Sequence, residues 1–315
     1  GVGRGGAPPL SVGVQPSPVQ PGGSGSGPSP PPPNPFESLP DDVLVAVLTK
    51  ADCRSATKLC EVLHCQEGVW QDACRERGWA AGKPVDRTWK EQFAYRCEHP
   101  PLADDTIREA VKVVLALPPP HVHSFYGPIA DWDVSKVTNM DTLFQAKHTF
   151  NGDLSRWDVS KVKYMSGMFS GAIVFDGDLS RWDVSEVTNM SNMFAHAYAF
   201  NSDLSRWDVS NVTKMHYMFT HAYVFNGDLP RWDVSKVTNM EEMFAHARAF
   251  KGDLSRWDVS TVTSTSGMFK SAFVFNGDLS RWDVSNVTEM DGMFITADAF
   301  NGDLSRWKVG NVTNT

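Results

Sequence analysis

Residues 175–197 read FDGDLSRWDVSEVTNMSNMFAHA, and this stretch decides the fold because close copies of it follow one another from residue 126 onward. Its tryptophan recurs every 25 residues. The eight positions are Trp132, Trp157, Trp182, Trp207, Trp232, Trp257, Trp282 and Trp307. A period of this length is typical of solenoid proteins, in which a single unit cannot bury its apolar side chains alone. We therefore expect the units to stack and equivalent side chains to form columns.

Two spacings alternate inside each unit. Trp182 and Val184 lie two residues apart, as on one side of a strand, with charged or hydroxyl residues around them. Met190, Met193 and Ala197 then recur at the spacing of one helical face. The sequence thus predicts one short strand and one short helical segment per coil. This is the layout of a leucine-rich-repeat solenoid, here of about seven 25-residue coils within a chain of the α+β class.

The recurrent pattern W-D-V-S-x-V-T-x-M-x-x-M-F resembles the BspA-like repeats, relatives of the leucine-rich repeats, over residues 125–315. The resemblance implies a binding or surface-display scaffold without catalytic activity. It also implies that an amphipathic helix expected at residues 104–117, inside the connecting segment 99–124, caps the first coil. The chain stops at Thr315 in the middle of a repeat, and we expect a solenoid truncated at that end.

Two columns of charge flank the tryptophans, with an arginine before each one from Trp157 onward and an aspartate after each one up to Trp282. We predict that these columns form a partner-binding face on the exposed side of the strands. The residues are Arg156, Asp158, Arg181, Asp183, Arg206, Asp208, Arg231, Asp233, Arg256, Asp258, Arg281 and Asp283. Adjacent columns of opposite sign offset the repulsion within each column. The alternative is a solvated charge ladder that only prevents aggregation.

Variation between units is concentrated in the expected helical segment and in the turn after it. Three consecutive units carry a histidine at one position and a large side chain two residues later. These are His196, His221 and His246, with Tyr198, Tyr223 and Arg248. Such a histidine column either is simply solvated or titrates near pH ~6.5 and binds metal. We favour the first, and because no nucleophile–base or paired-carboxylate pattern recurs, we predict no catalytic residues, no metal, no cofactor and no enzymatic activity.

The first third of the chain has a different composition. Residues 1–34 are mainly Gly, Pro and Ser, which predicts a disordered tail. Residues 35–98 carry apolar residues at helical spacing and predict a small all-α domain.

Three segments of this helical domain carry a second resemblance. The segments PFESLPDDVL (35–44), VWQDACRERGW (69–79) and TWKEQF (88–93) resemble an F-box domain. This resemblance, which covers residues 35–96, implies docking on the Skp-type adaptor of a cullin ubiquitin ligase. The docking residues it implies are Leu39, Pro40, Val43, Leu44 and Leu48. The alternative is a helical domain that only packs on the repeats.

Composition bounds the function of the 315-residue chain. A net charge of −8 lacks the basic surplus of a nucleic-acid binder, and no apolar run has the length of a membrane span. Five cysteines, all before residue 98 and without a C-x-x-C pair, favour reduced thiols and a cytoplasmic or nuclear location. We therefore predict a monomeric substrate-recognition subunit of a ubiquitin ligase, with a Skp-type adaptor and an unknown protein substrate as partners.

Two other functions stay open. One is a cell-surface or secreted BspA-like protein for adhesion or recognition, in which sequons would carry glycans. The sequon asparagines are Asn189, Asn211, Asn286 and Asn311. The other is a purely structural solenoid.

Overall fold

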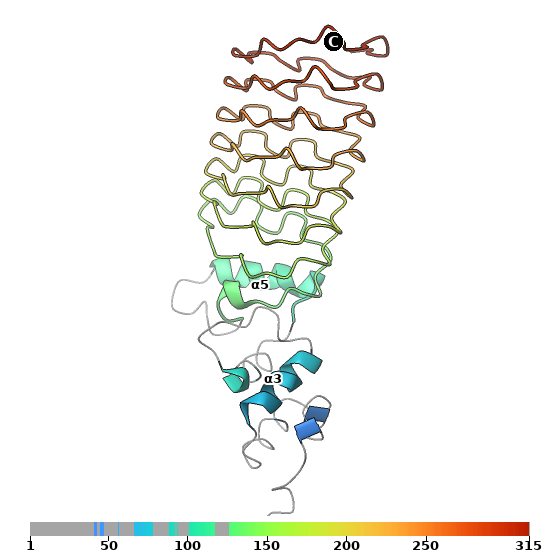
Figure 1. The fold of residues 1–315 in the computed structure, drawn as a ribbon. Helices are drawn as coiled ribbons and strands as arrows, with labels where there is room; N and C mark the ends of the chain where they lie inside the picture. The colour runs from blue at the N-terminus through green and yellow to red at the C-terminus, as the bar shows by residue number, and fades with distance from the viewer. Residues whose placement is uncertain are drawn as a thin grey trace, which may run out of the picture. The chain divides into compact units, whose positions relative to one another are not determined.

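The computed structural model describes the repeats and the segment before them. The described residues are 41–42, 45–46, 56, 66–77, 88–91, 93, 101–116 and 126–314. The helices whose two ends both lie in these ranges are α3 (Glu67–Glu76), α5 (Asp104–Ala116) and the short 3-10 helix η2 (Ile129–Asp131) (Figure 1). The predicted tail, residues 1–34, lies outside the described residues.

Coils of one repeat each stack on one another from α5 to the C-terminus (Figure 1). We count each coil from its tryptophan, so that coil 1 begins at Trp132 and coil 8 at Trp307. Isolated parallel bridges join equivalent residues of neighbouring coils, in the order Asn139, Tyr164, Asn189, Lys214, Asn239, Ser264, Glu289 and Asn314. Identical units therefore sit in register, and each side chain lies above its equivalent in the coil before.

The Trp–Val stretch expected as a strand is instead a pair of tight turns. In coil 3 the Trp182 amide donates to the Leu179 carbonyl at 3.1 Å, and the Val187 amide donates to Val184 at 2.9 Å. Aspartate side chains close these turns, because Asp183 Oδ1 accepts both the amide and the hydroxyl of Ser185. The alternation of apolar and polar residues here reflects turns with one buried corner each, and the inter-coil bridges lie further along the chain.

The Met–Phe segment expected as helical is also built from turns. The Met193 amide donates to Met190 and the Ala197 amide to Phe194, and positive φ angles of 59° and 58° occur inside these turns at Asn192 and His196. A positive φ that recurs at this spacing is incompatible with an α-helix. The Asn192 and Phe194 amides donate instead to carbonyls of the next coil, so this segment holds neighbouring coils together.

Aromatic columns fill the interior of the solenoid. Trp182 stacks on Trp207 with ring centroids 6.5 Å apart, and Phe194 stacks on Phe219 at 5.7 Å. From Trp157 onward each indole also donates a hydrogen bond to the carbonyl 28 residues earlier, as Trp182 Nε1 does to Leu154 at 3.0 Å. The tryptophan column thus contributes both apolar burial and a repeated inter-coil hydrogen bond.

Helix α5 takes the place of a coil beneath coil 1. Its apolar face, which includes Ile107 and Val111, belongs to the same buried cluster as the coils. In later coils the threonine amide after the Trp–Val turns donates to the preceding coil, as Thr213 does to Thr188. Thr138 of coil 1 has no preceding coil, and its amide donates to the Asp104 carboxylate of α5 at 2.6 Å. The helix therefore both covers the apolar end and accepts the backbone donors there.

The segment with F-box resemblance is described in part. Helix α3 buries Val69, Trp70, Ala73 and Cys74, and the Trp70 ring meets Phe93 edge-on at 5.0 Å. The five residues predicted to dock on an adaptor lie outside the described residues. They are Leu39, Pro40, Val43, Leu44 and Leu48. The F-box resemblance and the adaptor therefore stay predictions.

Candidate functional site

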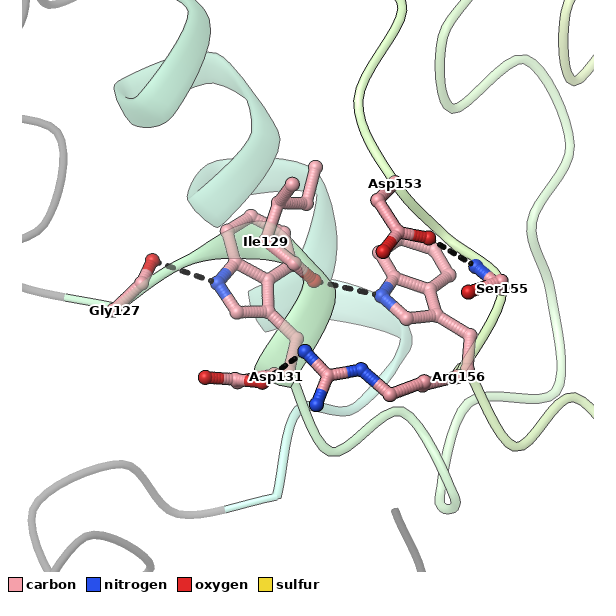
Figure 2. A network of polar contacts seen from close by, with 8 residues as sticks. Gly127, Ile129, Asp131, Asp153, Ser155 and Arg156 are labelled. Atoms are coloured by element: carbon pink, nitrogen blue, oxygen red, sulfur yellow. Dashed lines mark hydrogen bonds and ion pairs between the residues drawn. The ribbon is translucent and has the colours of Figure 1, made fainter. Parts of the chain in front are cut away.

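The arginine column lies on turns at the exposed surface. Arg156 forms an ion pair with Asp131 at 2.6 Å, because the first tryptophan of the series is preceded by an aspartate in place of the usual arginine (Figure 2). Each later arginine lies above another arginine and follows an aspartate three residues earlier, as Arg181 follows Asp178, on whose carboxylate its charge acts. Hydrogen bonds from Ser155, together with the neighbouring Arg156 guanidinium, hold the pKa of Asp153 below its usual value. The positive column is thus balanced within each coil.

The aspartates after the tryptophans maintain the backbone turns. Asp158 accepts the amide of Ser160 at 3.1 Å and its hydroxyl at 2.6 Å, and equivalent bonds recur along the column. An aspartate committed to a turn keeps only part of its surface for a partner. Whether the predicted Arg–Asp face binds anything stays a prediction, and its residues are nearly the same in every coil.

A second surface differs from coil to coil. Most of the large apolar side chains exposed in the repeats lie in two adjacent columns, one that contains Tyr198 and one that contains Val224. They are Val174, Tyr198, Val224, Phe273 and Val274, with exposed fractions between 38% and 47%. Exposed apolar side chains gathered in one place mark interaction surfaces. We call the part formed by Tyr198, Tyr223, Val224, Arg248, Phe273 and Val274 the coil 3–6 patch.

The histidine column runs beside this patch as a stack of parallel rings. His196 and His221 lie 4.5 Å apart between ring centroids, and His221 and His246 lie 4.2 Å apart. Next to them Tyr198 stacks on Tyr223 at 4.7 Å. Because the imidazoles are parallel, their nitrogens point side by side and do not converge on one ion. Among the described residues no group of three or more His, Cys, Asp or Glu has the arrangement of a metal site.

Burial and positive neighbours keep the middle of this stack neutral. Burial, followed by the charges of His246, His196, Arg248 and Lys270, lowers the pKa of His221 to about 4. Burial and Lys270 also lower the pKa of His246, although Glu242 acts in the opposite direction. At neutral pH His221 therefore presents an uncharged ring, and its Nδ1 lies 3.3 Å from the Tyr223 hydroxyl.

Arg248 is held between two aromatic rings. Its guanidinium carbon lies 4.4 Å from the ring centroid of Tyr223 in coil 4 and 6.0 Å from that of Phe273 in coil 6. Contact with both rings restricts the guanidinium, and the side chain stays exposed to solvent. The sequence places Arg248 after the histidines, but the contribution of Phe273 emerges only when all coils are aligned in register.

The sequons lie where their amides already have partners. Asn211 Nδ2 donates to the Ser185 carbonyl of the preceding coil at 2.8 Å, and Asn286 and Asn311 make the same bond to Ser260 and Ser285. A glycan attached to that nitrogen would remove one of its two donors. In Asn189 the side-chain oxygen accepts the amide and hydroxyl of Ser191.

One family model matches the repeats. It is described as a Mycoplasma protein of unknown function, DUF285, and it matches residues 120–232 and again residues 221–315, which is more than half of the chain. No curated protein matches the sequence. The match begins after the segment that resembles an F-box, so it bears on the repeats alone. In the part of the chain that the structure describes, no helix has the length and hydrophobicity needed to cross a membrane.

Proposed function

We propose, because the chain belongs to the DUF285 family of Mycoplasma proteins of unknown function and carries BspA-like repeats, that it is a non-catalytic scaffold for recognition at the cell surface or outside the cell. This is the alternative that the sequence left open. It has more support than the ubiquitin-ligase function, because the family match covers the repeats and nothing in the comparisons supports the F-box segment.

The observation that supports recognition is the contrast between core and surface columns. The buried tryptophans and phenylalanines are the same in almost every coil, as the columns headed by Trp132 and Phe144 show. The exposed columns that follow the Phe change from coil to coil and expose aromatic and aliphatic side chains. A constant interior with a variable surface provides a rigid support on which different coils make different contacts.

Accessibility on intact cells tests the location. Cells of the native host are treated with a membrane-impermeant biotin reagent, with a cytosolic protein as control. We expect the protein to be labelled before lysis, or to be recovered from the medium. Labelling only after lysis would contradict the proposal.

A second measurement separates the rival function. The chain is co-purified with a Skp-type adaptor, as the original sequence and as the double variant Leu39→Ala/Pro40→Ala. The surface proposal predicts no association that depends on these two residues. Adaptor binding that is lost in the variant would favour the ubiquitin-ligase function instead.

A further inference from the structure

We propose that the coil 3–6 patch is a binding site for an acidic, extended peptide segment of a partner protein, with Arg248 as the residue that binds its carboxylate. The inference rests on the proposed recognition function and gives it a site and a partner of defined chemistry. It departs from the prediction that the partner binds the Arg–Asp columns.

The charge of the patch is opposite to that of the whole chain. In coils 3 to 6 the four columns that contain Ala195, His196, Tyr198 and Ala199 carry no aspartate or glutamate, although the chain has a net charge of −8. They carry two cations, Arg248 and Lys270, beside the three histidines, of which His221 is uncharged at neutral pH. The charge of one acid, Glu242, acts on His246. In the column of Arg248 the first acid is Asp298, which belongs to coil 7. A local surplus of positive charge on an acidic protein favours an anionic partner.

Arg248 is already oriented for a carboxylate. Its guanidinium lies between the rings of Tyr223 and Phe273, and among the described residues it has no carboxylate within ion-pair distance. A planar guanidinium with a fixed orientation binds a carboxylate through two parallel hydrogen bonds and loses little rotamer entropy in doing so. Lys270 of the next coil lies close enough for its charge to lower the pKa of His246.

The apolar side chains around Arg248 favour a peptide over a sugar chain. Val224 and Val274 are 46% and 47% exposed, and Phe273 and Tyr198 are each 38% exposed. Exposed valines can pack against the apolar side chains of a bound protein segment. Tyr and Arg are also among the residues that are enriched at protein interfaces. The distance from coil 3 to coil 6 is three coil steps, or about 14 Å, which accommodates about four residues of extended peptide.

Fluorescence anisotropy with defined peptides tests the site. The probe is a fluorescein-labelled peptide of about ten residues in which Glu and Leu alternate, long enough to cross the patch in extended form. Two matched peptides replace Glu by Gln or by Lys. We expect the Glu peptide to bind, the Gln peptide to bind at least about tenfold more weakly, and the Lys peptide not to bind. The affinity for the Glu peptide should fall as salt increases, because screening weakens exposed charges.

Two substitutions at Arg248 and one elsewhere separate a site from general charge attraction. Arg248→Gln should lower affinity about tenfold, and Arg248→Lys should lower it several-fold although the charge is kept, because lysine lacks the planar two-point contact. Arg256→Gln removes an equal charge eight residues further along the same coil, from the arginine column, and should change the affinity less than twofold. Both arginines are at the surface, and unchanged thermal unfolding confirms that each variant is folded.

Each other result overturns the inference. Equal losses in Arg248→Gln and Arg256→Gln would mean diffuse attraction, and a loss only in Arg256→Gln would place binding on the Arg–Asp face. Binding of a heparin fragment that depends on Arg248, without binding of the Glu peptide, would assign the patch to a sulfated sugar. Absence of any peptide binding would also refute it. Surface labelling of intact cells does not depend on Arg248, so the recognition function can fail or hold independently.

Discussion

Replacing Thr265 by methionine should stabilise the solenoid. Thr265 is fully buried and occupies a core position that is methionine in coils 1 to 5. Its backbone makes the same bonds as those residues do, because its amide donates to Glu289 and its carbonyl accepts from Met268, just as Met240 bonds to Ser264 and Met243. The backbone conformation that carries methionine in the other coils is therefore present, and the threonine hydroxyl finds no hydrogen-bond partner among the described residues.

The expected gain is about 2 kcal/mol in the free energy of unfolding. Removing a buried hydroxyl without a partner contributes about 1–3 kcal/mol. The additional apolar volume of methionine contributes about 1 kcal/mol more, and ordering its longer side chain costs a similar amount. For a repeat region of this size, a gain of about 2 kcal/mol raises the midpoint of thermal unfolding by about 5 °C.

Thermal and urea unfolding, followed by tryptophan fluorescence, measure the effect directly because the tryptophan column runs through every coil. The reciprocal variant Met215→Thr creates the same defect in coil 4 and should lower stability by a similar amount. A Thr265→Met protein with native circular dichroism and an unchanged or lower midpoint would refute the reasoning. It would mean that the side chains around Thr265 leave no room for the longer methionine side chain.

Three further changes test separate parts of the structure. His221→Asn should flatten the pH dependence of stability. The pKa of His221 falls from 6.5 to about 4 on folding, so the folded state loses about 1 kcal/mol relative to the unfolded state, after allowance for solvent screening, as pH falls from 6.5 to 4. Unfolding midpoints between pH 7 and pH 4 measure this loss. Asp104→Ala removes the carboxylate of α5 that accepts from Thr138 and should lower the free energy of unfolding by about 1–2 kcal/mol. Amide hydrogen exchange should then increase first in coil 1, whereas a uniform increase along the solenoid would argue against a cap. Trp207→Phe keeps a stacked ring but removes one of the two donors to the Leu179 carbonyl, which retains the Trp182 amide. The lost hydrogen bond and the smaller ring together should cost about 2 kcal/mol in urea unfolding, and a neutral result would show that neither the indole N–H nor its larger ring contributes to stability.

The period of the solenoid and the identity of its core could be predicted from the sequence, but its backbone could not. Trp182, Val184 and Phe194 are buried as their recurrence requires. The spacing of Met190, Met193 and Ala197 matches one face of a helix, yet the same spacing arises when two turns each place one corner inward. The choice between them depends on the positive φ of Asn192 and His196, and on amides that donate to the next coil, neither of which periodicity records.

The candidate site divides in the same way. The histidine column and Arg248 are visible in the sequence as recurrent positions of the repeat. The position of Arg248 between Tyr223 and Phe273 is not, because it depends on the tilt of side chains across three coils. The predicted Arg–Asp columns drew attention through their regularity, and the structure explains the recurrence of the aspartates by a turn that each of them closes.

The histidines of coils 3 to 5 occupy a turn position whose backbone conformation recurs along the solenoid. The position that His196 occupies in coil 3 has a positive φ in each of coils 1 to 7, and coil 2 carries Gly171 there. Glycine is the residue that this conformation costs least, and a side chain with Cβ costs about 1 kcal/mol more. Coils 3 to 5 nevertheless carry His196, His221 and His246 at φ of 58°. Ala146, Ser271 and Thr296 adopt the same conformation in other coils, so the turn imposes this strain throughout, and what distinguishes coils 3 to 5 is the stack of imidazole rings beside Arg248.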